Sequence, residues 1–230
     1  MNFKIALTST AVLTALLISA TVQAATPYIE GQVGVTNLED TDTKPHSGSN
    51  GGITFTNTNL NLDYDSSTTF GFELGAKDVI PNVRIGASIS RMNFDLKSAT
   101  VNGSFTDGST DSTTTITGPS RVSGNDLAAV GLNLDKSVNL YMVNAYYDFK
   151  NSTDFTPFLG IGIGLADIEN TKDNEFAYAI NAGAKYNIGK QTYIGVKATY
   201  TTINGPKDER GFSFKDIKAC TANVSIGYEF

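Results

Sequence analysis

Apolar and polar residues alternate along most of the chain after residue 25, and a period of two is typical of β-strands whose two faces meet different surroundings. The clearest case is 220–230, in which the even residues are apolar or Cys and the odd residues are polar or Gly. The same alternation predicts eight strands, at residues 29–36, 70–77, 83–90, 141–149, 155–165, 176–186, 193–200 and 220–230. We therefore predict an all-β fold, an eight-stranded antiparallel barrel.

The third predicted strand departs from strict alternation near its end. Its apolar residues keep odd numbers up to Ile89, after which Met92 and Phe94 are apolar at even positions. A β-bulge near residues 90–91 would produce this change. Alternatively, if the barrel spans a membrane, residues 92–95 lie beyond the bilayer, where the direction of a side chain is unconstrained.

The composition of the two faces indicates which one lies inside the barrel. The apolar face carries bulky Ile, Val, Leu, Phe and Tyr, whereas the other face is rich in Gly and carries charges of both signs. An eight-stranded barrel has room inside for a modest set of side chains, so the bulky face is expected to meet lipid. A soluble barrel is the alternative, and its interior would be overfilled. Eight charged residues are then predicted to pair in the lumen: Glu30, Glu73, Lys77, Arg84, Asp148, Lys185, Lys197 and Glu229.

Aromatic residues and connection lengths also favour a membrane barrel. Tyr and Phe recur near strand ends, where membrane barrels carry aromatic girdles. Short turns on one side of the barrel and long loops on the other are typical of outer-membrane barrels. Within the second long loop, the Ser/Thr/Gly-rich residues 106–124 are predicted to form a mobile tip. The short connections are 78–82, 151–154 and 188–191, and the longer polar ones are 37–65, 97–137, 167–175 and 202–218.

The first 24 residues have the features of a secretory signal. Lys4 precedes an apolar run, and residues 22–24 form a small-residue cleavage pattern. We therefore predict a signal peptide at residues 1–24 and a barrel domain at residues 25–230. The net charge of residues 25–230 is −7, against −6 for the whole chain. One Cys and one His exclude an internal disulfide and leave little for zinc or His-based catalysis. No cofactor and no metal are expected, and the acidic balance argues against nucleic acid as a partner.

These features resemble the small eight-stranded outer-membrane barrels of the opacity-protein, OmpA and OmpX type, often classed as porin-family proteins. The most specific parts are the Gly-rich run 155–164 and the terminal strand that ends in Tyr228 and Phe230. The resemblance implies a Gram-negative outer membrane, both termini in the periplasm and long loops outside the cell. It also implies that Tyr228 and Phe230 belong to the signal read by the outer-membrane assembly machinery. The expected partners are outer-membrane lipid, that machinery and a host or environmental ligand at the loops, and a monomer is expected.

The sequence predicts function less directly, because one barrel architecture serves several functions. The leading hypothesis is a structural surface protein whose loops make the interaction, of the adhesin or surface-antigen type. A narrow porin-like channel for small solutes is the alternative, since charges and Gly line the lumen. An outer-membrane enzyme is the third hypothesis, with His46 near Asp42 as its candidate general base. No catalytic residue is assigned, because the sequence positions no partner for that His.

Overall fold

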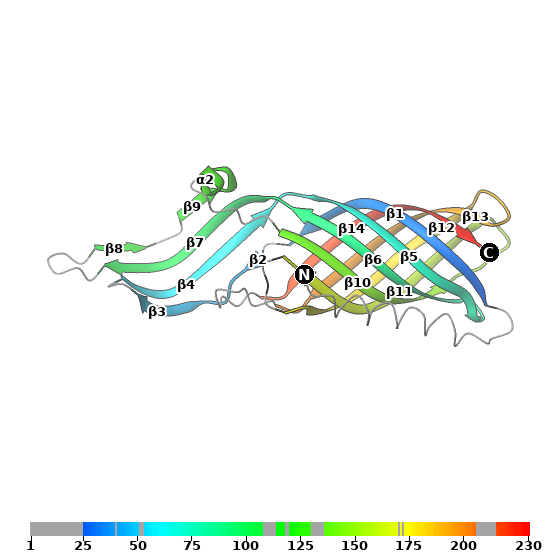
Figure 1. Cartoon of the computed structure of the whole chain (residues 1–230), viewed down its shortest axis with the longest axis horizontal. Coiled ribbons are helices and arrows are strands. Elements are labelled where there is room, and N and C mark those ends of the chain that lie inside the picture. The colour runs from blue at the N-terminus through cyan, green and yellow to red at the C-terminus, as the bar shows by residue number, and fades with distance from the viewer. Residues whose placement is uncertain are drawn as a thin grey trace.

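Eight strands close into an antiparallel barrel, which confirms the predicted fold class. The computed structural model describes residues 25–39, 41–50, 53–107, 114–117, 120–129, 136–169, 171, 173–205 and 215–230, so the predicted signal peptide at 1–24 lies outside the described residues. The barrel strands are β1 (Thr26–Leu38), β5 (Ser67–Ile80), β6 (Val83–Phe94), β10 (Lys136–Asp148), β11 (Phe155–Ile168), β12 (Glu175–Asn187), β13 (Thr192–Ile203) and β14 (Ile217–Glu229). Around the wall they follow the order β1-β14-β13-β12-β11-β10-β6-β5 (Figure 1).

Closure depends on pairing between the first and the last barrel strand. The antiparallel register of β1 and β14 runs from Tyr28 opposite Glu229 to Leu38 opposite Ala219. On its other side, β1 pairs with β5. Every barrel strand therefore has two neighbours, and no strand edge is left with unpaired backbone groups in a membrane. Among the described residues, no helix combines the length and the apolar character needed to cross a membrane.

The two faces of the wall separate as the alternation predicts. Outward-facing apolar side chains are exposed, for example Ile161 at 66% and Phe70 at 60%, and Cys220 is a free cysteine on this outer face. Inward-facing charges and aromatic rings are buried. A bulky apolar outer face is stable where lipid covers it, because the hydrocarbon chains replace water around it.

An apolar cluster fills the barrel at the end that carries the long connections. Met92 and Phe94 belong to it and are 4% and 1% exposed. The pairing of β6 continues without a shift from Ile89 to Met92 on both sides, so the suggested bulge at residues 90–91 is wrong. The alternative of unconstrained side chains is also wrong, because both side chains are packed inside. The apolar residues of β6 change from odd to even positions here because the interior of the barrel itself becomes apolar. The cluster consists of Met92, Phe94, Val138, Leu140, Met142, Ala166, Ile168, Ala177, Ala179 and Ile203.

The first two long connections contain strands. They form a second sheet, which we call the outward sheet: β2 (Thr41–Asp42), β3 (His46–Asn50), β4 (Ile53–Tyr64), β7 (Leu96–Asp107), β8 (Thr114–Thr117) and β9 (Ser120–Ser123). The helix α2 (Gly124–Ala129) follows β9. Within the predicted mobile tip at 106–124, β8 and β9 are strands where a loop was expected, and residues 108–113 and 118–119 lie outside the described residues, so its mobility stays a prediction. Figure 1 shows β4 and β7 extending beyond the barrel, away from the C-terminal end of the chain.

The outward sheet continues the barrel wall. β4 runs into β5, and β6 runs into β7, so two neighbouring barrel strands prolong into two neighbouring strands of the sheet. At the junction, the amide of Asp65 donates to the carbonyl oxygen of Asp95 over 3.0 Å. The rings of Tyr64 and Phe94 meet edge to face, with centroids 6.4 Å apart. The junction is therefore held by backbone pairing and by packing onto the apolar cluster.

Two glycines of β1 should respond oppositely to an added methyl group. A Cβ at Gly34 would lie 2.2 Å from the carbonyl oxygen of Ala222, whereas nothing lies within 4 Å of a Cβ at Gly31. We expect Gly34→Ala to destabilise the barrel by about 1–3 kcal/mol through overpacking. Gly31→Ala should leave its stability unchanged. Urea unfolding in detergent micelles measures both, and equal midpoints for the two variants would contradict the described packing of β1 against β14.

Candidate functional site

Six charged side chains form one neutral cluster in the lumen, toward the end with the short turns. Strands from around the wall contribute three carboxylates and three cations, and each of these residues is at most 8% exposed. The attraction between opposite charges inside a low-dielectric interior offsets part of the cost of removing them from water. We call this set the ion cluster: Glu30, Glu73, Arg84, Asp148, Lys185 and Lys197.

Arg84 is the centre of the ion cluster because it approaches all three carboxylates. Its guanidinium nitrogens lie 3.6 Å from Asp148 Oδ2, 3.8 Å from Glu73 Oε1 and 4.0 Å from Glu30 Oε2. The same group lies over the ring of Tyr146, 4.1 Å from its centroid, which adds a cation–π contact. Lys185 Nζ donates to Asp148 Oδ2 over 2.9 Å. Loss of Arg84 would therefore leave an excess of buried negative charge.

Neutral residues donate hydrogen bonds to two of the three buried carboxylates, Glu73 and Glu30, and the sequence analysis missed these donors. Glu73 accepts from the hydroxyls of Tyr28 at 2.5 Å and Tyr146 at 2.8 Å, and from the amide of Asn144 at 3.1 Å. Glu30 accepts from the hydroxyl of Tyr193 at 2.8 Å. The alternation of the sequence already indicated these donors, because each of them lies on the same inward face of its strand as the predicted lumen charges. Aromatic residues near strand ends were instead attributed to the membrane interfaces.

The other two predicted lumen charges pair with each other near the short-turn end. Lys77 Nζ donates to Glu229 Oε2, and both side chains are partly buried. The predicted assembly-signal residues lie nearby at the end of the chain. The rings of Tyr228 and Phe230 are 5.2 Å apart and edge to face, and the Phe230 side chain is exposed. This arrangement describes their place in the barrel, and their role in assembly stays a prediction.

One face of the outward sheet carries a continuous set of polar side chains. In the register, Asn61 lies opposite Asp42 and Thr100, and Arg121 lies opposite Thr100. Arg121 also donates to Ser98 Oγ over 3.1 Å and to Asp63 Oδ2 over 3.3 Å. The opposite side of the same strands buries Leu62 and Ala99. We call the first set the polar face: Asp42, Asn61, Asp63, Ser98, Thr100 and Arg121.

The polar face is tied to the last long connection by one ion pair. Lys215 Nζ donates to Asp42 Oδ2 over 2.6 Å, and the amide of Lys215 donates to the carbonyl oxygen of Asp42 over 2.9 Å. Asn61 Nδ2 donates to the other carboxylate oxygen of Asp42 over 2.7 Å. The hydrogen bond from Lys215 holds the pKa of the Asp42 carboxyl below its ordinary value of 3.8, although partial burial opposes the shift. The first and last long connections are thereby joined.

Acid should release this connection. Because the folded pKa of Asp42 is depressed, its ion pair contributes fully above the pKa of the unfolded chain, and the contribution disappears as pH falls through the folded pKa. We expect the protection factor of amides near Lys215, which is the intrinsic exchange rate at each pH divided by the measured rate, to fall about two- to five-fold between pH 5 and pH 2, the range of an exposed ion pair. Asp42→Asn should already show the lower protection factor at pH 5. Lys97→Gln, which alters a separate exposed charge, serves as the control, and an unchanged pH profile in Asp42→Asn would contradict this reading.

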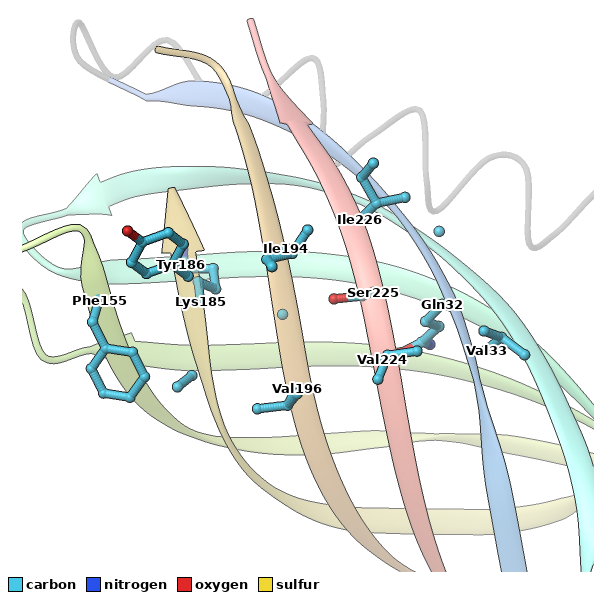
Figure 2. A pocket seen from close by; sticks show the side chains of 13 residues that line it. Gln32, Val33, Phe155, Lys185, Tyr186, Ile194, Val196, Val224, Ser225 and Ile226 are labelled. Carbon is cyan, nitrogen blue, oxygen red and sulfur yellow. The ribbon is translucent and has the colours of Figure 1, made fainter. Parts of the chain in front are cut away.

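A groove of about 670 Å³ lies on the outer surface of β1 and β12–β14. Figure 2 shows Ile194 and Val196 on β13, beside Val224 and Ile226 on β14. The groove belongs to the apolar outer surface that lipid covers in a membrane barrel.

The candidates for catalysis are not assembled into a site by the described residues. His46 begins β3 opposite Thr58, and Asp42 is engaged by Lys215 and Asn61. Within the described ranges, no group of three or more His, Cys, Asp or Glu residues could hold a metal ion.

Comparisons with known proteins agree with this architecture. Outer membrane protein PagN of Salmonella typhimurium (strain LT2) is 31% identical over 139 residues, which cover 46% of this chain and 57% of that protein. The chain thus matches little more than half the length of this curated relative. The crystal structure of Neisserial surface protein A superposes with a TM-score of 0.52 at 11% identity, over 90% of this chain and 100% of that one, and shows the fold alone.

The family comparison decides between a membrane barrel and a soluble one. The model of the "Outer membrane protein beta-barrel domain" family matches residues 8–230, nearly the whole chain. A soluble barrel is therefore excluded, and the bulky outer face of the wall meets lipid. The chain belongs to the outer membrane protein β-barrel family, and its place is the bacterial outer membrane.

Proposed function

We propose that the protein is a structural surface barrel whose outward sheet binds a host or environmental ligand, as an adhesin or surface antigen does. The observation that carries this proposal is the folding of two long connections into one sheet that prolongs the barrel wall and presents the polar face. A sheet held by backbone pairing presents its side chains with less loss of conformational entropy on binding than separate flexible loops would. Binding, rather than catalysis, is the role we assign to the chain.

The contents of the lumen also support the proposal that the barrel is a scaffold and that the outward sheet makes the interaction. The ion cluster occupies one half of the interior and the apolar cluster occupies the other. A solute would have to pass through both layers, and each leaves it little room, so they favour a scaffold over the channel alternative. We propose that the predicted lumen charges stabilise the barrel, that residues 1–24 form its signal peptide, and that Tyr228 and Phe230 serve in its assembly.

Removal of the outward sheet tests the proposal. In one variant, residues 41–63 and 98–123 are each replaced by a short Gly/Ser linker. In a second, Thr100 and Arg121 are both changed to Ala, which leaves the sheet but alters its polar face. Each is expressed in a non-adherent bacterial strain, and adherence to cultured epithelial cells and to glass is compared at equal surface amount.

We expect wild type to raise adherence over the empty strain, and the variant without the sheet to lose the whole increase. The variant with an altered polar face should lose most of it. A heat-dependent shift on gel electrophoresis verifies that each barrel is folded. Full adherence without the outward sheet would overturn the proposal, as would a wild-type strain that adheres to neither surface better than the empty strain.

A further inference from the structure

A small cavity lies inside the barrel between the ion cluster and the apolar cluster. Its volume is about 40 Å³. Lys197 and Asn144 border it from the polar side, while Leu140 and Met142 border it from the apolar side. A cavity needs roughly 10–15 Å³ to hold one water molecule, so this one has room for about two or three.

Three buried polar atoms lie in residues that line this cavity and have no hydrogen-bond partner among the described residues. They are Gln32 Oε1, Asn181 Nδ2 and Asn223 Oδ1. Asn181 and Asn223 are more than nine-tenths buried. A buried polar atom without a partner loses its hydrogen bonds to water and gains none in return, so such atoms are rare in folded proteins. Two acceptors and one donor around one cavity match the bonding of water, which both donates and accepts.

The distances at Lys197 point to the same cavity. Its Nζ is 3.8 Å from Glu30 Oε1 and 3.9 Å from Glu73 Oε2, beyond hydrogen-bond length. Lys197 also lies directly opposite Asn223 in the register of β13 and β14. An ammonium group whose nearest carboxylates lie beyond 3.5 Å can take water as a hydrogen-bond partner. The Lys197 side of the ion cluster thus lacks the direct bonds that Lys185 makes to Asp148.

We infer that this cavity is a binding site for a cluster of about two or three ordered water molecules, which bond Gln32, Asn181, Asn223 and the ammonium of Lys197. The water completes the hydrogen bonds of three buried polar side chains that lie beside the ion cluster. The lumen then has three layers, ionic, aqueous and apolar. This inference concerns the barrel interior and is independent of what the outward sheet binds.

Magnetisation transfer from water to the side-chain amide of Asn181 tests the inference in the refolded barrel in lipid nanodiscs. The signal is assigned in protein labelled at Asn with nitrogen-15, by its loss in Asn181→Asp. We expect wild type to show transfer from a long-lived water to this amide. Absence of transfer, under conditions that detect other buried waters of the sample, would overturn the inference.

Three variants make the result specific. Thr199→Val removes the hydroxyl that bonds Asn181 Oδ1 at 2.8 Å and could relay the transfer, and the signal should persist. Ala179→Met fills the cavity from β12, so the signal should disappear, whereas Ala182→Met on the outer face of the same strand should retain it. If Ala179→Met does not fold, Leu140→Phe fills the cavity from β10 with the same expectation. Transfer that survives in a folded cavity-filling variant, or that vanishes in Thr199→Val, would contradict bound water as its source.

Discussion

Replacement of Arg84 by Met should destabilise the barrel by about 3–5 kcal/mol, the cost of leaving a buried charge without its partner. Arg84 lies within 4.0 Å of all three carboxylates of the ion cluster. Its removal leaves three buried carboxylates with two lysines. Urea unfolding in detergent micelles, followed by the heat-dependent gel shift, measures the effect.

Two further variants separate charge from packing in this prediction. Arg84→Met combined with Asp148→Asn restores a neutral cluster, and it should recover part of the lost stability. Arg91→Met removes an exposed arginine from the outer face of the same strand, and its effect should stay within about 0.5 kcal/mol. A stable Arg84→Met barrel would show that the ion cluster does not depend on its central cation.

Replacement of Phe94 by Ala should cost a similar amount, about 3–5 kcal/mol, for a different reason. Phe94 is 1% exposed, belongs to the apolar cluster and packs edge to face on Tyr64. Its truncation leaves a cavity at the point where the barrel wall continues into the outward sheet. The same unfolding measurement applies, and protease cleavage within β4 or β7 should accelerate as well.

The matched control for Phe94→Ala is Phe70→Ala. Phe70 lies on the outer face of β5 and is 60% exposed, so in the membrane its ring meets lipid. Its truncation leaves the protein interior unchanged and should cost much less than truncation of Phe94. Equal losses for the two variants would contradict the view that the apolar cluster closes this end of the barrel.

The barrel strands could be predicted because the two faces of the barrel wall meet different surroundings. Lipid outside and a packed polar lumen inside require opposite residues at successive positions, as the register of β12, β13 and β14 shows. The alternation fails where both sides are apolar. At Met92 and Phe94 the interior is as apolar as the lipid, so parity alone suggested a bulge that the structure does not contain.

The outward sheet was missed because the alternation of β4 is interrupted: its apolar residues change from odd positions (Ile53, Phe55) to even ones (Leu60, Leu62) across a register shift. β4 and β7 are rich in Thr, Asn and Ser, which are also typical of loops. Their pairing is set by β5 and β6, which they prolong, and a register shift near Asn57 lies beside Gly103 at φ 123°. No local pattern encodes such long-range pairing.

The partners within the ion cluster could not be predicted for a related reason. The parity placed Glu30, Glu73, Arg84, Asp148, Lys185 and Lys197 on the inner face, and the structure finds them there. Which charges meet depends on the tilt and register of strands far apart in the sequence. Lys77 and Glu229, for example, lie on different strands and pair with each other outside the ion cluster.

A current recording in a planar lipid bilayer tests most directly that the barrel is a closed scaffold. The refolded wild-type protein is inserted at known density, and the current is recorded at voltages of both signs. We expect a current equal to that of the protein-free bilayer, because the ion cluster and the apolar cluster each obstruct the lumen. Reproducible current steps of constant size that disappear in Lys197→Met would contradict it and establish a channel through the lumen.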